Sequence, residues 1–382
     1  MREEWKYKKL GEVCTIKAGY TPQKNELSDN GAYPYYKVAD MNTLGNDVYL
    51  DITSSYKIDA NKLFPKGAIV FPKNGAAVST NKKRILKYDS IVDLNTGVAI
   101  FPKSINEKFA YYWFIDTDFK KYVRGGALPT LDIKSLKDKP FPSIDKSIQL
   151  AIVSELDKIN ELIRLKKEQL KDFDNLAQSI FYEMFGDPVE NEMGWEVSTY
   201  SKCFNIGSGG TPSKSVPEYW DNGNIPWIGS NMCQNCIITE TDGKFITQEG
   251  LNNSSTKYLE VGTVLVALVG ATIGKVALLR TPTCTNQNVA FIKANESKDF
   301  VPEYVFYNLM GQYEEFMKIG KGNFKMANQA FIKALPILSP PLPLQHLFAH
   351  RIEQIEHQKS EVQKAITDLE TLLASRMQYW FE

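Results

Sequence analysis

Residues 206–215 read IGSGGTPSKS, and residues 16–25 read IKAGYTPQKN. Both stretches fit the pattern I-x-x-G-x-T-P-x-K, with every fixed residue at the same spacing. Glycines before Lys-Ser are also typical of phosphate-binding loops, but Ser213 stands where the last glycine of G-x-x-x-x-G-K-[ST] belongs. The sequence therefore predicts a turn between strands in each stretch, and the echo indicates an internal repeat.

The repeat extends along most of the chain in the same order. A tryptophan opens each copy, at Trp5 and at Trp195. Four more pairs of stretches match, namely 32–41 with 224–232, 64–78 with 259–273, 95–101 with 286–292, and 133–142 with 332–341. We therefore predict two domains of one fold, at residues 1–142 and 191–341.

Each predicted domain is followed by a long stretch without Gly or Pro, from Lys146 to Phe185 and from Leu344 to Phe381. Apolar residues recur there at heptad a and d positions, which is typical of a coiled coil. We expect these spacer helices, within residues 143–190 and 342–382, to pair in antiparallel orientation. The predicted seam residues are Ile152, Leu156, Ile159, Ile163, Leu170, Phe173, Ile180, Phe348, Ile352, Ile355, Val362, Ile366, Leu369 and Leu373.

The signals within each domain are mixed. Short apolar runs bounded by Gly and Pro predict strands, and residues 108–123 and 302–319 predict amphipathic helices. The fold class is therefore α+β. We expect two similar domains with a mixed, mostly antiparallel β core and helices, joined by two long helices in an antiparallel coiled coil, with pseudo-two-fold symmetry.

Composition and charge narrow the class of protein. Hydrophobic residues make up 43% of the chain, but no apolar run is long enough to cross a bilayer. The N-terminus lacks the apolar core of a signal peptide, so we expect a cytoplasmic protein. Residues 1–142 hold 23 Lys/Arg and 16 Asp/Glu, a balance of +7 within a chain of zero net charge. This basic segment suits a polyanionic partner.

The sequence shows no catalytic constellation. The three histidines, His346, His350 and His357, all fall in the last predicted helix, so neither domain can build a Ser/His/Asp triad. The stretch SPPL at 339–342 resembles the [DNS]-P-P-[YFW] motif of amino-methyltransferases, but a leucine cannot stack on a flipped base. We predict a non-catalytic chain with no bound cofactor.

A metal site is not expected either. Cys233 and Cys236 form a close pair of cysteines, whereas a structural zinc site usually needs two such pairs. His346 and His350 lie four residues apart on a helix, but their repeat equivalents are Leu150 and Ser154, so the repeated architecture does not require the two histidines.

Two similar domains on a rigid rod suit a target with two separated parts. Ile152 to Ile180 would span roughly 42 Å at about 1.5 Å per residue. That length corresponds to roughly 12 base pairs of DNA at about 3.4 Å per step. Duplex DNA is the natural candidate, because half-sites along it lie at a fixed helical spacing.

The repeated motifs resemble the specificity subunits of type I restriction–modification enzymes. The resemblance rests on residues 206–232, 268–279 and 286–292, and on SIFYEMFGDP at 179–188. It covers nearly the whole chain, and the combination G-x-T-P-x-K followed by IPWI is its most specific part. The first domain departs from this pattern, since AGYTPQKN lacks the paired glycines.

The resemblance implies that each domain is a target recognition domain that reads one half of an interrupted DNA sequence. It implies spacer helices that set the gap and dock two methyltransferase (modification) subunits, which a motor-nuclease (restriction) subunit joins. S-adenosylmethionine is then expected on the methyltransferase partner. A different class of function, a structural adaptor that binds protein or glycan, stays open at this point.

Polar and basic residues in predicted turns are the candidates for DNA contact. Lys and Arg would mostly contact phosphates, and Asn could read adenine edges. The aligned Gly-rich loops 124–130 and 320–326 are the strongest candidates. The predicted DNA-binding residues are Thr21, Lys24, Lys37, Lys73, Asn74, Arg124, Thr211, Ser213, Lys214, Asn231, Lys275, Lys321, Asn323 and Lys325.

Overall fold

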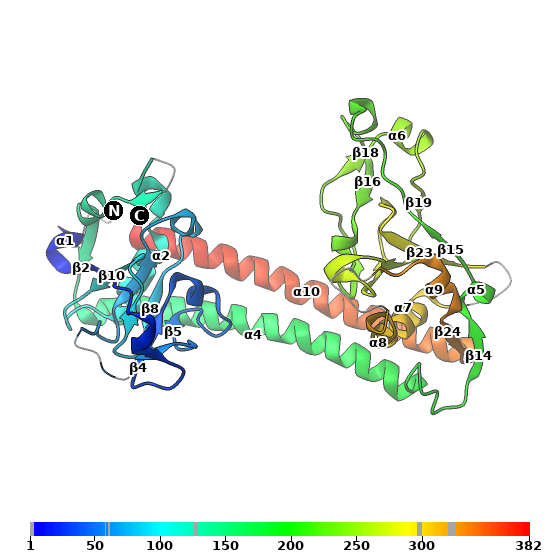
Figure 1. The fold of residues 1–382 in the computed structure, drawn as a ribbon, viewed down its shortest axis with the longest axis horizontal. Helices are drawn as coiled ribbons and strands as arrows, with labels where there is room; N and C mark the ends of the chain where they lie inside the picture. Colours follow the sequence, from blue (N-terminus) through cyan, green and yellow to red (C-terminus); the bar gives the residue numbers. More distant parts are fainter. Residues whose placement is uncertain (1–3, 58, 60–61, 126–128, 296–299, 320–325) are drawn as a thin grey trace. The chain divides into compact units, whose positions relative to one another are not determined.

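The computed structural model describes residues 4–57, 59, 62–125, 129–295, 300–319 and 326–382. The chain separates into two compact units, which we call unit 1 (residues 1–167 with 364–382) and unit 2 (residues 168–363). Each unit holds one globular repeat and one part of each long helix (Figure 1). The domain boundaries predicted after residues 142, 190 and 341 stay a prediction.

Unit 1 is built on a five-stranded sheet in the order β2-β10-β7-β8-β5 and a four-stranded sheet in the order β3-β6-β4-β9. The pairs β5–β8 and β4–β9 are parallel, and the other neighbours in these sheets are antiparallel. The strands are β1 Lys6–Lys9, β2 Thr15–Ala18, β3 Leu27–Ser28, β4 Tyr33–Tyr36, β5 Tyr49–Leu50, β6 Tyr56–Lys57, β7 Ile69–Pro72, β8 Arg84–Leu86, β9 Ile91–Val92, β10 Thr96–Ile100, β11 Val123–Arg124, β12 Thr130–Leu131 and β13 Pro140–Ser143.

Unit 2 repeats this topology with the sheets β15-β23-β20-β21-β17 and β18-β16-β22-β19. The parallel pairs in unit 2, β17–β21 and β16–β22, are the counterparts of the parallel pairs β5–β8 and β4–β9 in unit 1. The strands are β14 Glu196–Thr199, β15 Phe204–Ser208, β16 Ile225–Ile228, β17 Cys236–Ile238, β18 Phe245–Ile246, β19 Tyr258–Leu259, β20 Val264–Ala267, β21 Val276–Leu279, β22 Thr283–Thr285, β23 Val289–Ala294 and β24 Pro336–Ser339. The predicted repeat and the mostly antiparallel sheets are confirmed.

Helices complete each unit. In addition to the two long helices, the α-helices are α1 Leu10–Val13, α2 Glu107–Asp116, α3 Ile133–Lys137, α5 Tyr200–Cys203, α6 Gln248–Asn252, α7 Pro302–Gly311, α8 Tyr313–Met317 and α9 Gln329–Ala334. Short 3₁₀ helices are η1 Lys24–Glu26, η2 Val38–Asn42, η3 Ala76–Thr80, η4 Phe119–Tyr122, η5 Pro217–Tyr219, η6 Ser230–Met232 and η7 Gly270–Thr272.

The central strand of each five-stranded sheet is buried on both faces. In β7, Ile69 and Phe71 join the core beneath α2, whereas Val70 joins the core that includes residues of β4 and β9. This split follows from the alternation of side chains along a strand. It explains why β7 and β20 read as continuous apolar runs in the sequence.

The helix expected at 108–123 ends earlier than predicted. α2 begins after Asn106, whose side chain accepts hydrogen bonds from two backbone N–H groups of the first turn. It ends at Asp116, because the next residue, Thr117, has an extended backbone. Residues 109–114 are all buried, so the helix is enclosed rather than amphipathic. It is enclosed because it packs between the five-stranded sheet and the long helices.

The helix expected at 302–319 is also divided. Gln312 separates α7 from α8, and its buried side chain donates a hydrogen bond to the carbonyl oxygen of Pro336 at 3.0 Å. The break redirects the chain, and the ring of Phe316 in α8 then packs into the unit 2 core.

The two long helices are α4 Lys146–Phe185 and α10 Leu342–Phe381. In unit 1, Glu155 of α4 pairs with Arg376 of α10, and Lys167, further along α4, pairs with the earlier Glu370 at 2.7 Å. The partner residue moves backwards along α10 as α4 advances, so the helices are antiparallel there.

The helix pair in unit 2 follows the same rule. Asp174 of α4 pairs with Lys359 of α10, and Met184 accepts a hydrogen bond from the earlier Arg351. The predicted antiparallel pairing is therefore confirmed in each unit. All fourteen predicted seam residues are buried or half-buried, as expected for positions that face the partner helix.

A lysine lies in the core of unit 1. Lys83 is fully buried, and its ammonium group donates hydrogen bonds to Asn81 Oδ1 at 2.6 Å and to the Thr117 carbonyl at 2.7 Å. It also lies 4.1 Å from the centre of the Phe119 ring. Burial lowers the pKa of Lys83 to about 7, and the nearby Asp118 carboxylate only partly opposes this shift.

We predict that replacing Lys83 by methionine removes part of the pH dependence of stability. Because the folded pKa lies below the unfolded value, the unfolded chain binds more protons between about pH 7 and 10, so stability rises with pH there. Lys83 contributes a slope of about 1.4 kcal/mol per pH unit in that window. Urea unfolding of both proteins at pH 7 and 9 measures this difference, and equal slopes would contradict the assignment.

Candidate nucleic-acid interface

The repeated G-x-T-P motif closes onto one turn in each unit. In unit 1, Gly19 N–H donates to the Thr96 carbonyl at 3.0 Å, and Tyr20 N–H donates to the Val92 carbonyl at 2.9 Å. A Cβ on Gly19 would lie 2.2 Å from the carbonyl oxygen of Asp93. Only glycine permits this approach. The motif therefore clamps the turn of residues 93–96.

The side chains within this turn are also held in place. Asp93 accepts hydrogen bonds from Asn95 N–H at 2.8 Å, from the Thr21 hydroxyl at 2.9 Å and from the Tyr35 hydroxyl at 3.2 Å. Burial acts to raise the pKa of Asp93, but these hydrogen bonds outweigh it, and the pKa is lowered. The turn thus presents a fixed carboxylate.

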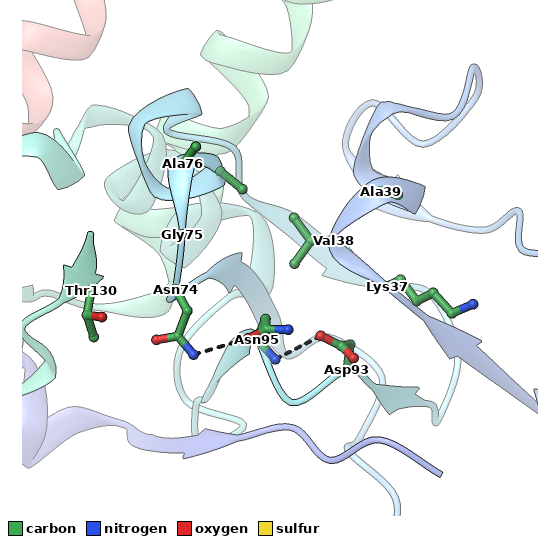
Figure 2. Close-up of a pocket in the computed structure, with 10 residues that line it drawn as sticks. Lys37, Val38, Ala39, Asn74, Gly75, Ala76, Asp93, Asn95 and Thr130 are labelled. Carbon is green, nitrogen blue, oxygen red and sulfur yellow. Dashed lines mark hydrogen bonds between the residues drawn. The ribbon is translucent and has the colours of Figure 1, made fainter. Parts of the chain in front are cut away.

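The 93–96 turn forms one wall of an open pocket of about 730 Å³ in unit 1. The pocket lies where β4, β7 and β9 end, so loops from three strands converge on it. Its lining residues are Lys37, Val38, Ala39, Asn74, Gly75, Ala76, Ala77, Asp93, Asn95 and Thr130. From left to right, Figure 2 shows Thr130, Asn74, Asn95 and Asp93 across the pocket, with Lys37 further to the right.

The pocket combines hydrogen-bonding groups with one basic side chain. Asn74 Nδ2 donates to Asn95 Oδ1 at 3.3 Å, which orients both amides (Figure 2). Amides, a carboxylate and a hydroxyl are the groups that read base edges, and lysine suits phosphate. The polar side chains of the lining are therefore of the kinds that contact nucleic acid, and they lie beside the apolar Val38, Ala39, Ala76 and Ala77.

Unit 2 has the same clamp and the same turn. Asn286 accepts from Asn288 N–H at 3.0 Å through its side chain and from Val289 N–H at 3.2 Å through its carbonyl. A Cβ on Gly209 would lie 2.1 Å from the carbonyl oxygen of Thr285. The GSGG stretch is therefore a backbone clamp on the turn of residues 286–289.

This equivalence corrects the sequence alignment by two residues. The motif match pairs 95–101 with 286–292, whereas the strand register pairs Asn95 with Asn288. An asparagine begins both matched stretches, but Asn286 is the first residue of its turn, whereas Asn95 is the third residue of the turn at 93–96.

The equivalent face of unit 2 carries different chemistry. The bridge between Asn74 and Thr130 in unit 1 corresponds to a bridge between Val269 and Met326 in unit 2. Met326 is 68% exposed, so an apolar side chain is displayed where unit 1 has a hydroxyl. The backbone frame is shared, and the residues it displays differ.

Two of the six residues predicted in unit 1 line this pocket, and two more form hydrogen bonds to the 93–96 turn beside it. Lys37 and Asn74 line the pocket, and Thr21 bonds to its wall. Lys73 does not line the pocket, but its backbone N–H donates to the Asn95 carbonyl at 2.8 Å. The other two predicted residues, Lys24 and Arg124, are exposed but do not line it.

Arg124 instead forms an ion pair next to the pocket. It contacts Asp132 at 2.8 Å, and Asp132 caps α3. The Ser135 hydroxyl and the Arg124 guanidinium lower the pKa of Asp132 to about 2. The Gly-rich loop that follows Arg124 is described only at Gly125, Pro129 and Thr130.

The residues predicted in unit 2 are more scattered. Thr211 bonds to the 286–289 turn, and Lys275 bonds to Gln234 at 2.6 Å. A Cβ on Gly229 would lie 2.7 Å from Asn231 Oδ1 and 3.4 Å from Asn286 Nδ2, so both side chains lie near Gly229. Ser213 bonds to Ser215, and Lys214 lines a separate pocket with Trp220. Lys321, Asn323 and Lys325 lie outside the described residues.

The family of type I restriction modification DNA specificity domains matches this chain twice, at residues 2–172 and 192–371. The chain belongs to this family. Its two DNA specificity domains correspond to the two repeats, and each match runs into the long helix that follows its repeat.

Characterised relatives agree with the family. The chain is 26% identical to the EcoR124I/EcoR124II specificity subunit of Escherichia coli over 227 residues, which cover 56% of this chain and 54% of the relative. It is 24% identical to the HindI specificity subunit of Haemophilus influenzae over 307 residues, covering 77% and 64%. With the MjaIX specificity subunit of Methanocaldococcus jannaschii, 22% identity covers 97% and 91%. The chain thus spans less than two thirds of the first two relatives.

Solved structures show the same fold. An S subunit of the type I restriction–modification system of M. genitalium aligns with a TM-score of 0.54 at 16% identity, over all of this chain and 98% of that one. A chain from a structure concerned with complex assembly and conformational transition of a type I R-M system aligns with a TM-score of 0.63 at 17% identity, with the same coverage.

The specificity domains contain functional candidates that sequence reasoning missed. Asp93, Asn95 and Asn288 are not among the predicted DNA-binding residues, because the motif match sets the two repeats two residues out of register and does not reveal the turn that contains them. Lys82 was missed although it occupies the position of Lys275, and it bonds to Asn42 on η2 as Lys275 bonds to Gln234.

Two further observations concern what the specificity domains lack. No described helix is both long and apolar enough to cross a membrane. Within the described residues, no three His, Cys, Asp or Glu side chains gather as metal ligands. Burial raises the pKa of the Cys233 thiol to about 12, which disfavours the thiolate that binds metal.

Proposed function

We propose that this chain is the DNA-reading subunit of a type I restriction–modification complex. Each specificity domain contacts one half of a bipartite, interrupted site through the face that contains the clamped turn. The helix pair sets the gap between the halves and docks two methyltransferase subunits. An adaptor for protein or glycan finds no support in the family match.

The observation that carries this proposal is that both units have the same backbone arrangement around the clamped turn, whereas the exposed residues beside that turn differ. Gly19 and Gly209 approach the backbone of equivalent turns at equally short range. The faces beside those turns differ, as Thr130 and Met326 illustrate. A reader of two different half-sites needs this combination of a fixed frame and variable contacts.

The chemistry of methylation belongs to the partner in this proposal. S-adenosylmethionine binds to the methyltransferase subunits, and a motor-nuclease subunit completes the restriction complex. The specificity chain supplies no catalytic group and no cofactor site. The test is that the chain with its methyltransferase partner methylates one bipartite sequence, whereas methylation without sequence preference would contradict the proposal.

We predict that replacing Lys37 by alanine weakens DNA binding by that complex and lowers its salt dependence. Lys37 is exposed and lines the unit 1 pocket. Loss of one phosphate contact should reduce the slope of log K against log salt by about 0.9. Binding measured at several salt concentrations gives this slope.

Lys66→Ala is the matched control for this prediction. Lys66 is exposed as well, but it precedes β7, whereas the pocket lies where β7 ends. The proposal expects Lys66→Ala to leave the slope unchanged. An equal effect of both substitutions would mean that the pocket is not the contact surface.

A further inference from the structure

The tip of the clamped turn in unit 2 carries a glutamine that is held in one orientation. Gln287 is exposed, yet its Oε1 accepts a hydrogen bond from the Thr211 hydroxyl at 2.6 Å. Thr211 is the threonine of the repeated G-x-T-P motif. An exposed glutamine ordinarily samples many rotamers, and ordering it on binding costs free energy. The bond from Thr211 removes part of that cost in advance.

The turn beneath Gln287 is itself fixed. Asn286 N–H donates to the Ile228 carbonyl at 3.1 Å, and Asn288 N–H donates to the Asn286 side chain at 3.0 Å. The Gly209 clamp lies against the residue before the turn. The side chain at position 287 is thus displayed from a backbone with little freedom to move.

In unit 1, the residue at the tip of the turn and the hydrogen bond of the motif threonine are both different. Thr21, the equivalent of Thr211, donates to Asp93 at 2.9 Å, one residue before the tip. The tip residue is Leu94, which is 51% exposed. The motif threonine therefore donates a hydrogen bond to a side chain of the turn in both units. In unit 2 that side chain is the one at the tip, whereas in unit 1 it belongs to the preceding residue.

We propose that Gln287 is a base-reading residue for the second half-site and that it recognises adenine, with Thr211 as its positioning residue. This inference rests on the proposed function. A glutamine amide reads adenine by donating from Nε2 to N7 and accepting at Oε1 from the N6 amino group. Oε1 has two lone pairs, so it can accept from Thr211 and from adenine at once.

The test uses the complete chain with its methyltransferase partner and maps methylated adenines across random DNA. The wild type is expected to methylate a bipartite sequence with a required adenine in the half-site of the second domain. Gln287→Leu is expected to lower the preference for that adenine by about 5- to 100-fold, since one bidentate contact supplies roughly that discrimination. The first half-site should not change.

Two further variants separate positioning from structure. Thr211→Val is expected to weaken the same preference, and Thr211→Ser, which keeps the hydroxyl, is expected to restore it. Gln248→Leu on α6 is the control for an exposed glutamine elsewhere in unit 2, and it should leave the site unchanged. Thermal unfolding of each variant checks that the fold is intact.

The outcomes distinguish the inference from the proposed function. A wild-type complex without sequence preference overturns both. A specific wild-type complex whose second half-site is identical in Gln287→Leu overturns the inference alone. A weakened preference in Thr211→Val that serine does not restore overturns the positioning role of Thr211.

Discussion

Replacing Gly19 by alanine is expected to destabilise unit 1 by roughly 3–5 kcal/mol, which is large for a single methyl group. The new Cβ would lie 2.2 Å from the Asp93 carbonyl oxygen and 2.3 Å from that of Val92. Both contacts are with backbone, so no side chain can rotate away. The 93–96 turn must shift, and the hydrogen bond from Gly19 N–H to the Thr96 carbonyl is then lost.

Gly125→Ala provides the matched control within unit 1. Among the described residues, a Cβ at Gly125 would meet no atom within 4 Å, so the substitution should leave stability almost unchanged. Urea unfolding followed by circular dichroism measures both variants against the wild type. Equal stability of Gly19→Ala and Gly125→Ala would show that the turn can yield at little cost, and the clamp would lose its role.

The clamp also shows how far the sequence could be interpreted. The repeat, the long helices and the mostly antiparallel sheets were predictable, because each depends on a pattern that many residues share. The role of GSGG was not predictable, since it depends on the contact between Gly209 and the distant Thr285. No local pattern encodes a backbone approach between segments so far apart in sequence.

The candidate site was only partly predictable for the same reason. Lys37 and Asn74 were found because they are polar residues in turns beside apolar strands. Asp93 was not, because its position follows from strand register, and the register differed from the motif alignment by two residues. The helix expected at 108–123 failed at Thr117, where the chain turns so that Phe119 enters the core.

Replacing Phe348 by alanine is expected to destabilise unit 2 by about 3–5 kcal/mol. Phe348 is fully buried on α10, and its ring lies 5.6 Å from Phe181, 5.4 Å from Phe185 and 5.3 Å from Tyr307, measured between ring centres. The two phenylalanines belong to α4, and Tyr307 belongs to α7. One side chain therefore joins three helices, and truncating it leaves a cavity that all three border.

Leu347→Ala is the matched control, because Leu347 is the preceding residue of the same helix and is 47% exposed. Its loss should change stability by at most about 0.5 kcal/mol. The pair of variants also tests how unit 2 folds. Since Phe348 links the helix pair to the globular part, Phe348→Ala should lower the midpoints of the helical signal and of the tryptophan signal together. A helical transition that moves alone would mean that the helix pair and the sheet of unit 2 unfold separately.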